Sequence, residues 1–178
     1  MRTDLTILLD TDFVSSFAWV NRMDILEGLY SGRMMVLEEV MIELERVRSL
    51  ADLVCFSIMH GHIKRKGMMA GSAEALEYAR LHDRDQYGSG EAACMAYAYC
   101  RGGIVASNNL KDVNRYCDER QIQLLTTADV LSRFYHDGRT TLDEADALWC
   151  RMASRQRSLP AKSFTEYLEN LDRLGGLK

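Results

Sequence analysis

The sequence predicts an α/β fold with a central, mostly parallel sheet flanked by helices, and three observations indicate it. Short apolar runs, such as residues 7–9 and 103–107, have the length and composition of buried strands. Longer stretches between them carry apolar residues at helical spacing. Strand and helix alternate along the chain, which is the pattern of parallel strands joined by helical crossovers.

The first half of the chain gives five helices and two or three strands. The strand at residues 7–9 is followed by helical spacing at 13–20 and 24–30, and a Ser31-Gly32 break precedes a second strand at 33–39. Helices are expected at 40–47 and from 49 to about 60. Residues 61–69 fit either a short edge strand or a loop. A helix capped by Ser72 runs to residue 85.

The second half continues the alternation as far as Gly138. Gly88 and Gly90 interrupt the chain before a helix that begins at Glu91 and ends near Cys100, at a glycine pair. Residues 103–107 and 122–125 are expected to be strands, with a helix between them at 111–121. A further helix, capped by Thr126 or Thr127, ends at Gly138.

Beyond Gly138 the sequence has no strand candidate. Two helices are expected at residues 141–157, capped by Thr140 or Thr141, and at 163–174, with Pro160 between them. We therefore expect a main domain at residues 1–138 and a helical C-terminal extension at 139–178, packed on the same domain.

Composition narrows the functional classes. The chain has 178 residues, 47% of them apolar and 27% charged, which is typical of a globular domain with a substantial core. The net charge of −4 means that nucleic-acid binding would need a local basic patch or bridging cations. The five cysteines form no C-x-x-C pair, and no apolar run approaches the roughly 18 residues of a membrane span. The beginning of the chain lacks a signal-peptide pattern, so a cytoplasmic protein that does not enter a membrane is expected.

Acidic residues fall where a parallel sheet binds its ligands. Asp10 and Asp12 directly follow the first strand, and the tract SNNLKD, residues 107–112, follows the strand at 103–107. Ligands of open parallel sheets bind beyond the carboxyl ends of the strands. Glu43 and Glu91 lie at apolar-flanked positions near predicted helix starts. Carboxylates that converged there would repel one another and raise each other's pKa values, which a divalent cation would relieve.

Such a cluster has a defined chemistry. Mg²⁺ and Mn²⁺ prefer oxygen ligands, and Mg²⁺ usually keeps several waters. An ion of this kind can activate a water and stabilise the charge that develops on a phosphodiester. Thr11, Ser107 and Asn109 carry hydroxyl and amide groups that could orient those waters. If these residues converge in the fold, they could form a metal site with the chemistry of phosphodiester hydrolysis.

Four segments resemble, in order, the motifs of the PIN domain, the nuclease fold of VapC-type toxins. They are LLDTDFV, IEL, GSGEAACMAYA and VASNNLKDV, and the resemblance covers roughly residues 6–134. Carried over by position, it implies a PIN-like three-layer fold and a catalytic and metal-binding quartet of Asp10, Glu43, Glu91 and Asp112. It assigns supporting positions to Thr11, Asp12, Ser107 and Asn109.

The resemblance also implies a function. It implies a Mg²⁺- or Mn²⁺-dependent endoribonuclease that cuts single-stranded RNA to leave 5′-phosphate and 3′-hydroxyl ends. It further implies an antitoxin protein as partner, and a homodimer. The chain departs from the pattern of compact VapC toxins because its third acid, Glu91, is more often aspartate, because residues 53–85 are longer, and because the helices beyond Gly138 are additional.

Several of these residues could have a purely structural role instead. Glu91 could simply complement a helix dipole, Asp112 could cap a helix, and Glu38 or Glu39 could replace Glu43 in the quartet. His60 and His62 resemble a ligand pair but have no third ligand nearby.

Two further functions also remain open. ILLDTDFV fits the D-x-D motif of haloacid-dehalogenase-type phosphatases, in which Asp10 would be the nucleophile and Asp12 the acid and base. A non-catalytic PIN-like scaffold could instead bind RNA or protein, docking a partner through the apolar face of its first tail helix, formed by Leu142, Ala145, Leu148, Trp149 and Met152.

Overall fold

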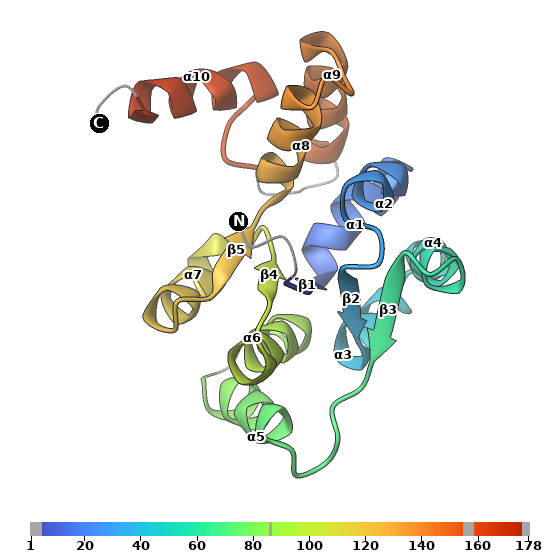
Figure 1. Ribbon diagram of the computed structural model, residues 1–178, viewed down its shortest axis with the longest axis vertical. Helices are drawn as coiled ribbons and strands as arrows, with labels where there is room; N and C mark the ends of the chain where they lie inside the picture. Colours follow the sequence, from blue (N-terminus) through green and yellow to red (C-terminus); the bar gives the residue numbers. More distant parts are fainter. Residues whose placement is uncertain (1–4, 86, 155–158, 176–178) are drawn as a thin grey trace.

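The computed structural model describes residues 5–85, 87–154 and 159–175, and it has a five-stranded sheet at its centre (Figure 1). The strands are β1 (Ile7–Leu9), β2 (Met34–Leu37), β3 (Ile63–Lys66), β4 (Ile104–Ala106) and β5 (Gln123–Leu125). They lie in the order β3-β2-β1-β4-β5, and every neighbouring pair is parallel. The predicted α/β class with a mostly parallel sheet is confirmed.

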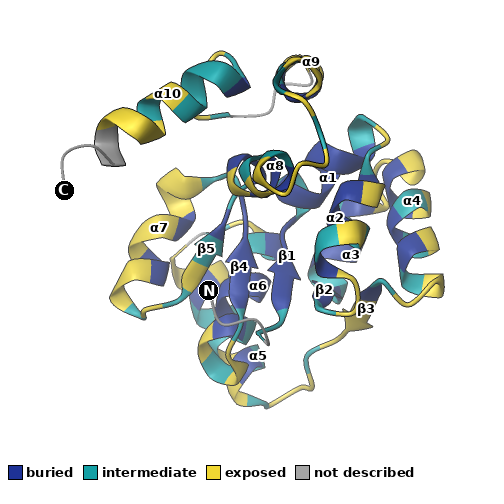
Figure 2. Ribbon diagram, turned by 45° about the horizontal axis from the view of Figure 1, so that its top comes forward, coloured by how far each residue is buried: buried dark blue, intermediate teal, exposed yellow. Residues whose placement is uncertain are grey.

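Helices connect the strands and cover the sheet. The helices that precede β3 are α1 (Thr11–Trp19), α2 (Met23–Tyr30), α3 (Glu38–Leu44) and α4 (Arg48–Met59). Those that follow it are α5 (Ala73–Ala79), the π-helical turn η1 (Arg80–Arg84), α6 (Ser89–Arg101), α7 (Leu110–Glu119), α8 (Thr127–His136), α9 (Leu142–Ala153) and α10 (Phe164–Gly175). α1, α2 and α8 lie on one face of the sheet and α5 and α6 on the other, which gives three layers (Figures 1 and 2).

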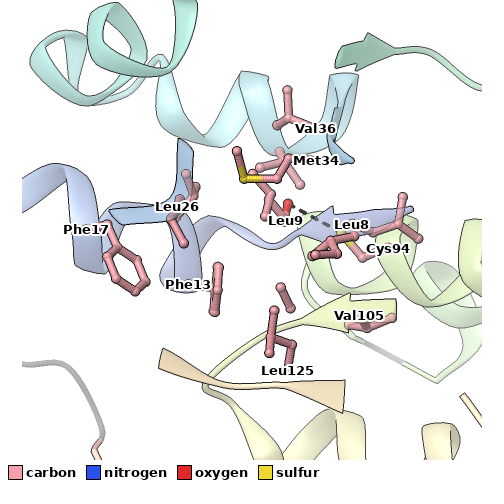
Figure 3. Packing of buried hydrophobic residues seen from close by; sticks show 14 of the residues in the cluster. Leu8, Leu9, Phe13, Phe17, Leu26, Met34, Val36, Cys94, Val105 and Leu125 are labelled. Atoms are coloured by element: carbon pink, nitrogen blue, oxygen red, sulfur yellow. Dashed lines mark hydrogen bonds between the residues drawn. The ribbon is translucent and has the colours of Figure 1, made fainter. Parts of the chain in front are cut away.

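The core forms around β1, the central strand. Ile7, Leu8 and Leu9 are all fully buried, because helices cover both faces of the sheet at this strand. Figure 3 shows Leu8 and Leu9 among side chains from β2, β4, β5 and the helices of both layers. Cys94 of α6 donates from its thiol to the carbonyl of Leu9 at 3.6 Å, which ties that helix to the end of β1.

Most helices and strands lie where the sequence predicts them. Residues 63–66 form the edge strand β3, in which only Ile63 is buried and the charged residues after it face solvent, as a protected edge requires. Ser72, Thr126 and Thr141 are N-caps, the last two in capping boxes. The predicted strand 33–39 ends two residues early, because Glu38 and Glu39 already belong to the first turn of α3.

The helical extension corrects one sequence-based hypothesis. Ala145, Leu148, Trp149 and Met152 of α9 are buried inside the chain, and Trp149 and Phe164 lie with their rings 5.7 Å apart. This face is therefore covered by the protein itself and cannot be the docking surface of a scaffold. The predicted end of that helix at residue 157 lies outside the described residues. Within the described ranges, no helix is long and apolar enough to cross a membrane.

Candidate active site

The site lies at the point where the strand order reverses. From β1 the chain proceeds outward to β2 and β3, then returns to β4 on the other side of β1, so the carboxyl ends of β1 and β4 border the crevice where such sheets bind ligands. Asp10 follows β1 and Ser107 follows β4. The Ser107 hydroxyl donates to Oδ2 of Asp10 at 2.9 Å, and the backbone N–H of Thr11 donates to Oδ1 at 2.7 Å. Asp10 also caps α1 and is only 3% exposed.

Glu43 reaches the same place from α3. The Thr11 hydroxyl donates to its Oε2, and the backbone N–H of Gly90 donates to its Oε1 at 2.9 Å. Gly90 packs closely against this group: a Cβ atom at this position would lie 2.9 Å from Oε2 of Glu43 and 3.1 Å from Oδ1 of Asp10. The two carboxylates therefore approach a common point from different elements.

The other two acids of the predicted quartet meet through an amide. Nδ2 of Asn109 donates to Oε1 of Glu91 at 2.6 Å and to Oδ2 of Asp112 at 2.7 Å. The backbone N–H of Asn109 donates to the Ser107 hydroxyl at 3.2 Å, which links this pair to Asp10. Asn109 is also the N-cap residue of α7, so the start of that helix fixes both acids.

These groups surround one cavity of about 560 Å³. Its acidic side is formed by Asp10, Asp12, Glu43, Glu91 and Asp112, and its apolar side by Trp19, Leu44, Val47 and Leu50. Among the described residues that line it, none is lysine, arginine or histidine. Oδ1 of Asp12 is buried and has no hydrogen-bond partner in the described part of the chain. The cavity thus concentrates negative charge that no basic side chain of its lining neutralises.

Burial and mutual repulsion perturb two of the acids. Burial raises the pKa of Asp10 well above its usual range, and the charges of Asp12 and Glu91 raise it further, while the Ser107 hydroxyl partly offsets this. Burial also raises the pKa of Glu91, helped by the charges of Asp112 and Asp12 and opposed by the Asn109 hydrogen bond. A cation in the cavity would lower both pKa values.

The donor set suits a hard divalent ion. The polar side chains of the lining offer only oxygen atoms, apart from the amide nitrogen of Asn109, and oxygen is the ligand that Mg²⁺ and Mn²⁺ prefer. Across the described ranges, no three histidine, cysteine, aspartate or glutamate side chains are arranged to hold one ion together. An ion in this cavity would have to take most of its ligands from water, as Mg²⁺ often does in proteins.

The structure brings the predicted site residues together. Asp10, Thr11, Asp12, Glu43, Glu91, Asn109 and Asp112 line the cavity, and Ser107 lies fully buried behind Asp10.

The competing residues lie elsewhere. Glu38 pairs with Arg65 at 2.6 Å on the surface. His60 bonds through Nδ1 to the carbonyl of Phe56 at 2.8 Å, and Nδ1 of His62 lies 2.9 Å from the Ser31 hydroxyl. Neither histidine lines the acidic cavity.

Two contributors to the site are not evident from the sequence. Gly90 has the sequence signature of a chain break only, although its backbone N–H binds Glu43. Asn108 bonds through its amide to the hydroxyl and the backbone N–H of Thr127, both at 2.9 Å, and so fastens the loop after β4 to α8. The pair Asn108-Asn109 directly after a strand is the sequence signal for such a role, but the partners of Asn108 are too distant in sequence to be predicted.

Comparison with known proteins gives structural neighbours only. No protein-family model matches the chain, and no curated protein sequence matches it. One similar solved structure is DNA-bound VapBC from Salmonella typhimurium, with 19% identity, a TM-score of 0.47, and coverage of 68% of this chain and 98% of that chain. Another is a VapBC complex from Rickettsia felis bound to a promoter DNA fragment, with 14% identity, a TM-score of 0.46 and the same coverage. The chemistry of the cavity, and not this likeness, supports the function proposed below.

Proposed function

We propose that the chain is a Mg²⁺- or Mn²⁺-dependent endoribonuclease that cleaves single-stranded RNA. One observation carries the proposal: five carboxylates surround a single cavity at the sheet's switch point, and no basic side chain is found in the described lining. Holding these acids together is electrostatically unfavourable without a cation. The motif resemblance adds the substrate class.

Each residue of the cavity has a role that follows from its position. A divalent cation, when bound, would supply an activated water and stabilise charge on the scissile phosphate. Asp10 and Glu43 would hold it, because their oxygens approach a common point and each is fixed by two hydrogen bonds. Asn109 would keep Glu91 and Asp112 oriented toward the cavity from the other side.

Two basic side chains beside the acids are candidates for contacting a nucleic-acid backbone. A smaller hollow of about 320 Å³ adjoins the site at Gly88 and Asp112, and it is lined by Lys111 and Arg115 as well as by Asp85 and Asp112. Arg115 also pairs with Glu119 at 3.0 Å, so Lys111 is the cation of this hollow with no ion pair among the described residues. Side chains of this kind position phosphate groups of a nucleic-acid backbone. Single strands fit best, because their phosphates and bases can enter a cavity separately.

The partners follow from the family that the motifs resemble. We infer that the nuclease is the toxin of a toxin–antitoxin pair, held by an antitoxin protein, and that it forms a homodimer. The described residues offer no observation that favours the phosphatase alternative.

Cleavage assays test the proposal directly. Mixed single-stranded RNA, double-stranded RNA and single-stranded DNA would be incubated with the wild type, Asp10→Asn and a matched control, each with Mg²⁺, Mn²⁺ or EDTA. Asp143→Asn is that control, because Asp143 is exposed on α9 and outside the cavity. We expect metal-dependent cutting of single-stranded RNA by the wild type and the control only. Cutting that persists in EDTA or in Asp10→Asn would reject the mechanism.

A further inference from the structure

A second cavity continues from the acidic one toward the C-terminal extension. It has a volume of about 720 Å³ and shares Asp12, Glu91 and Asn109 with the acidic cavity. Leu159, Pro160 and Tyr167 of the extension form part of its wall. The helices beyond Gly138 therefore do more than cover the core, because they help to build a compartment directly beside the proposed cleavage site.

The lining of this cavity combines apolar, amide and charged groups. Leu110, Leu159 and Pro160 are apolar, Asn108 and Asn114 are amides, Lys111 is a cation, and Asp12, Glu91 and Asp129 are carboxylates. In the described part of the chain, Lys111 makes no ion pair and the Asn114 side chain makes no hydrogen bond. The Asn108 amide is already bonded to Ser16 and Thr127, so Asn114 is the amide left to bind a ligand. Apolar faces, this amide and one cation suit an occupant that is flat, polar at its edges and attached to a phosphate. A nucleotide with an unpaired base has this chemistry.

Tyr167 is the aromatic group of the cavity, and its ring is held in place. The ring centroid lies 5.6 Å from that of the buried Trp149, with 30° between the planes. The Tyr167 hydroxyl donates to Oδ1 of Asp129 at 3.5 Å. The hydroxyl contact is long, so the ring is fixed mainly by its packing against Trp149, and a ring fixed in this way can stack a base without first losing its own freedom of movement.

We propose that this second cavity is a base-binding subsite for the unpaired RNA nucleotide adjacent to the cleaved phosphodiester. Tyr167 stacks the base, Asn114 bonds its edge, and Lys111 contacts its phosphate. The inference depends on the proposed RNA substrate. It gives the C-terminal extension a role in choosing which nucleotide lies beside the cut.

Binding by an inactive protein tests the subsite apart from catalysis. The probe is a fluorescent single-stranded RNA, together with copies in which one nucleotide at a time is abasic. Each would be titrated by anisotropy against full-length Asp10→Asn and against the same protein carrying Tyr167→Ala or Tyr167→Phe. Phe56→Ala in the same background is the control, since Phe56 is an exposed ring on α4 that lines neither cavity.

The expected result is that the effect of one abasic position on binding depends on whether Tyr167 is present. One abasic position should weaken binding to Asp10→Asn by about tenfold, the contribution of a single base–aromatic stack. The same position should have little further effect once Tyr167→Ala is present, while Tyr167→Phe and Phe56→Ala should behave as the parent. Since Tyr167→Ala also removes a ring from the Trp149 contact, Asn114→Ala provides a second variant, expected to weaken binding about threefold at the same position.

Failure of the subsite and failure of the nuclease give different results. Tight RNA binding in which no abasic position couples to Tyr167 or Asn114 overturns the subsite, even if the wild type cleaves RNA. Absence of any RNA binding also overturns it. Coupling at Tyr167 in a protein that cleaves nothing with any metal supports the subsite and rejects the nuclease.

Discussion

Gly90→Ala separates the geometry of the acidic cavity from the stability of the fold. The added Cβ would lie 2.9 Å from Oε2 of Glu43, 3.0 Å from Oγ1 of Thr11 and 3.1 Å from Oδ1 of Asp10. Comfortable contacts to carbon begin near 3.5 Å, so these groups must move by about 0.5 Å. Asp10 and Glu43 are each held by two hydrogen bonds, so neither can turn away freely.

A shift of this size matters more for catalysis than for folding. Catalytic groups need positions accurate to about 0.5 Å, and an error of about 1 Å can cost a factor of about 100 in rate. We therefore expect kcat/KM for RNA to fall by about ten- to a hundredfold. Alanine is favoured over glycine in a helix by about 1 kcal/mol, which opposes a packing cost of about 1–3 kcal/mol. The free energy of unfolding should then change by less than about 2 kcal/mol.

The assay compares cleavage rates with urea denaturation of the same preparations. Gly28→Ala is the control, because Gly28 is also helical and its Cβ would approach only Nη1 of Arg139, the end of an exposed side chain that can move. It should keep wild-type activity. Full activity and unchanged Mn²⁺ affinity in Gly90→Ala would refute the idea that Asp10 and Glu43 act from the positions seen here.

Three further predictions concern stability and reactivity. Because the folded state raises the pKa of Asp10, it binds that proton more tightly than the unfolded chain, so stability falls as pH rises from about 4 through the raised value. In EDTA, Asp10→Asn should therefore be more stable than the wild type at neutral pH but not at low pH, and equal urea midpoints at neutral pH would contradict this. Trp149→Ala leaves a cavity at a fully buried position and should lower the free energy of unfolding, measured with urea, by about 3–5 kcal/mol. A loss below about 1 kcal/mol would mean that α9 and α10 contribute little to the stability of the fold. Iodoacetamide at pH 8 should modify exposed Cys150 but neither Cys94 nor Cys117, because burial raises the pKa of both thiols, that of Cys117 to about 12. Mass spectrometry would detect the labelled residues. Labelling of Cys94 or Cys117 before the protein unfolds would contradict this prediction.

Much of the fold could be predicted because its signals are local. A fully apolar run marked β1 as a buried strand, and threonine pairs marked the two helix starts at which the structure has capping boxes on Thr126 and Thr141. The boundary between β2 and α3 was harder to predict, because neither a capping residue nor a glycine or proline precedes Glu38. The π-helical turn after Ala79 gave no signal, because a change from i→i+4 to i→i+5 bonding leaves the apolar spacing almost unchanged.

What could not be predicted depends on contacts between distant segments. Periodicity showed that one face of α9 is apolar but not that Phe164, twelve or more residues later, would cover it. The positions of the acids could be expected at strand ends, yet the role of Gly90 arises only where α6 meets α3. Likewise, nothing in the tract after β4 indicates that Asn109 would join two carboxylates. These contacts are properties of the assembled sheet and not of any one segment.

The cost of the acidic cavity is itself an argument about function. An apolar residue at the position of Asp10 would leave one carboxylate fewer to repel the neighbouring acids, although α1 would lose its N-cap. Instead the chain holds Asp10 by hydrogen bonds from Thr11 and Ser107 while burial and Glu91 disfavour its charge. Hydrogen bonds of this kind stabilise the ionised form without neutralising it. A carboxylate that the fold fixes without a basic partner is where the proposed function would place a cation from outside the chain, as metal-dependent hydrolysis requires.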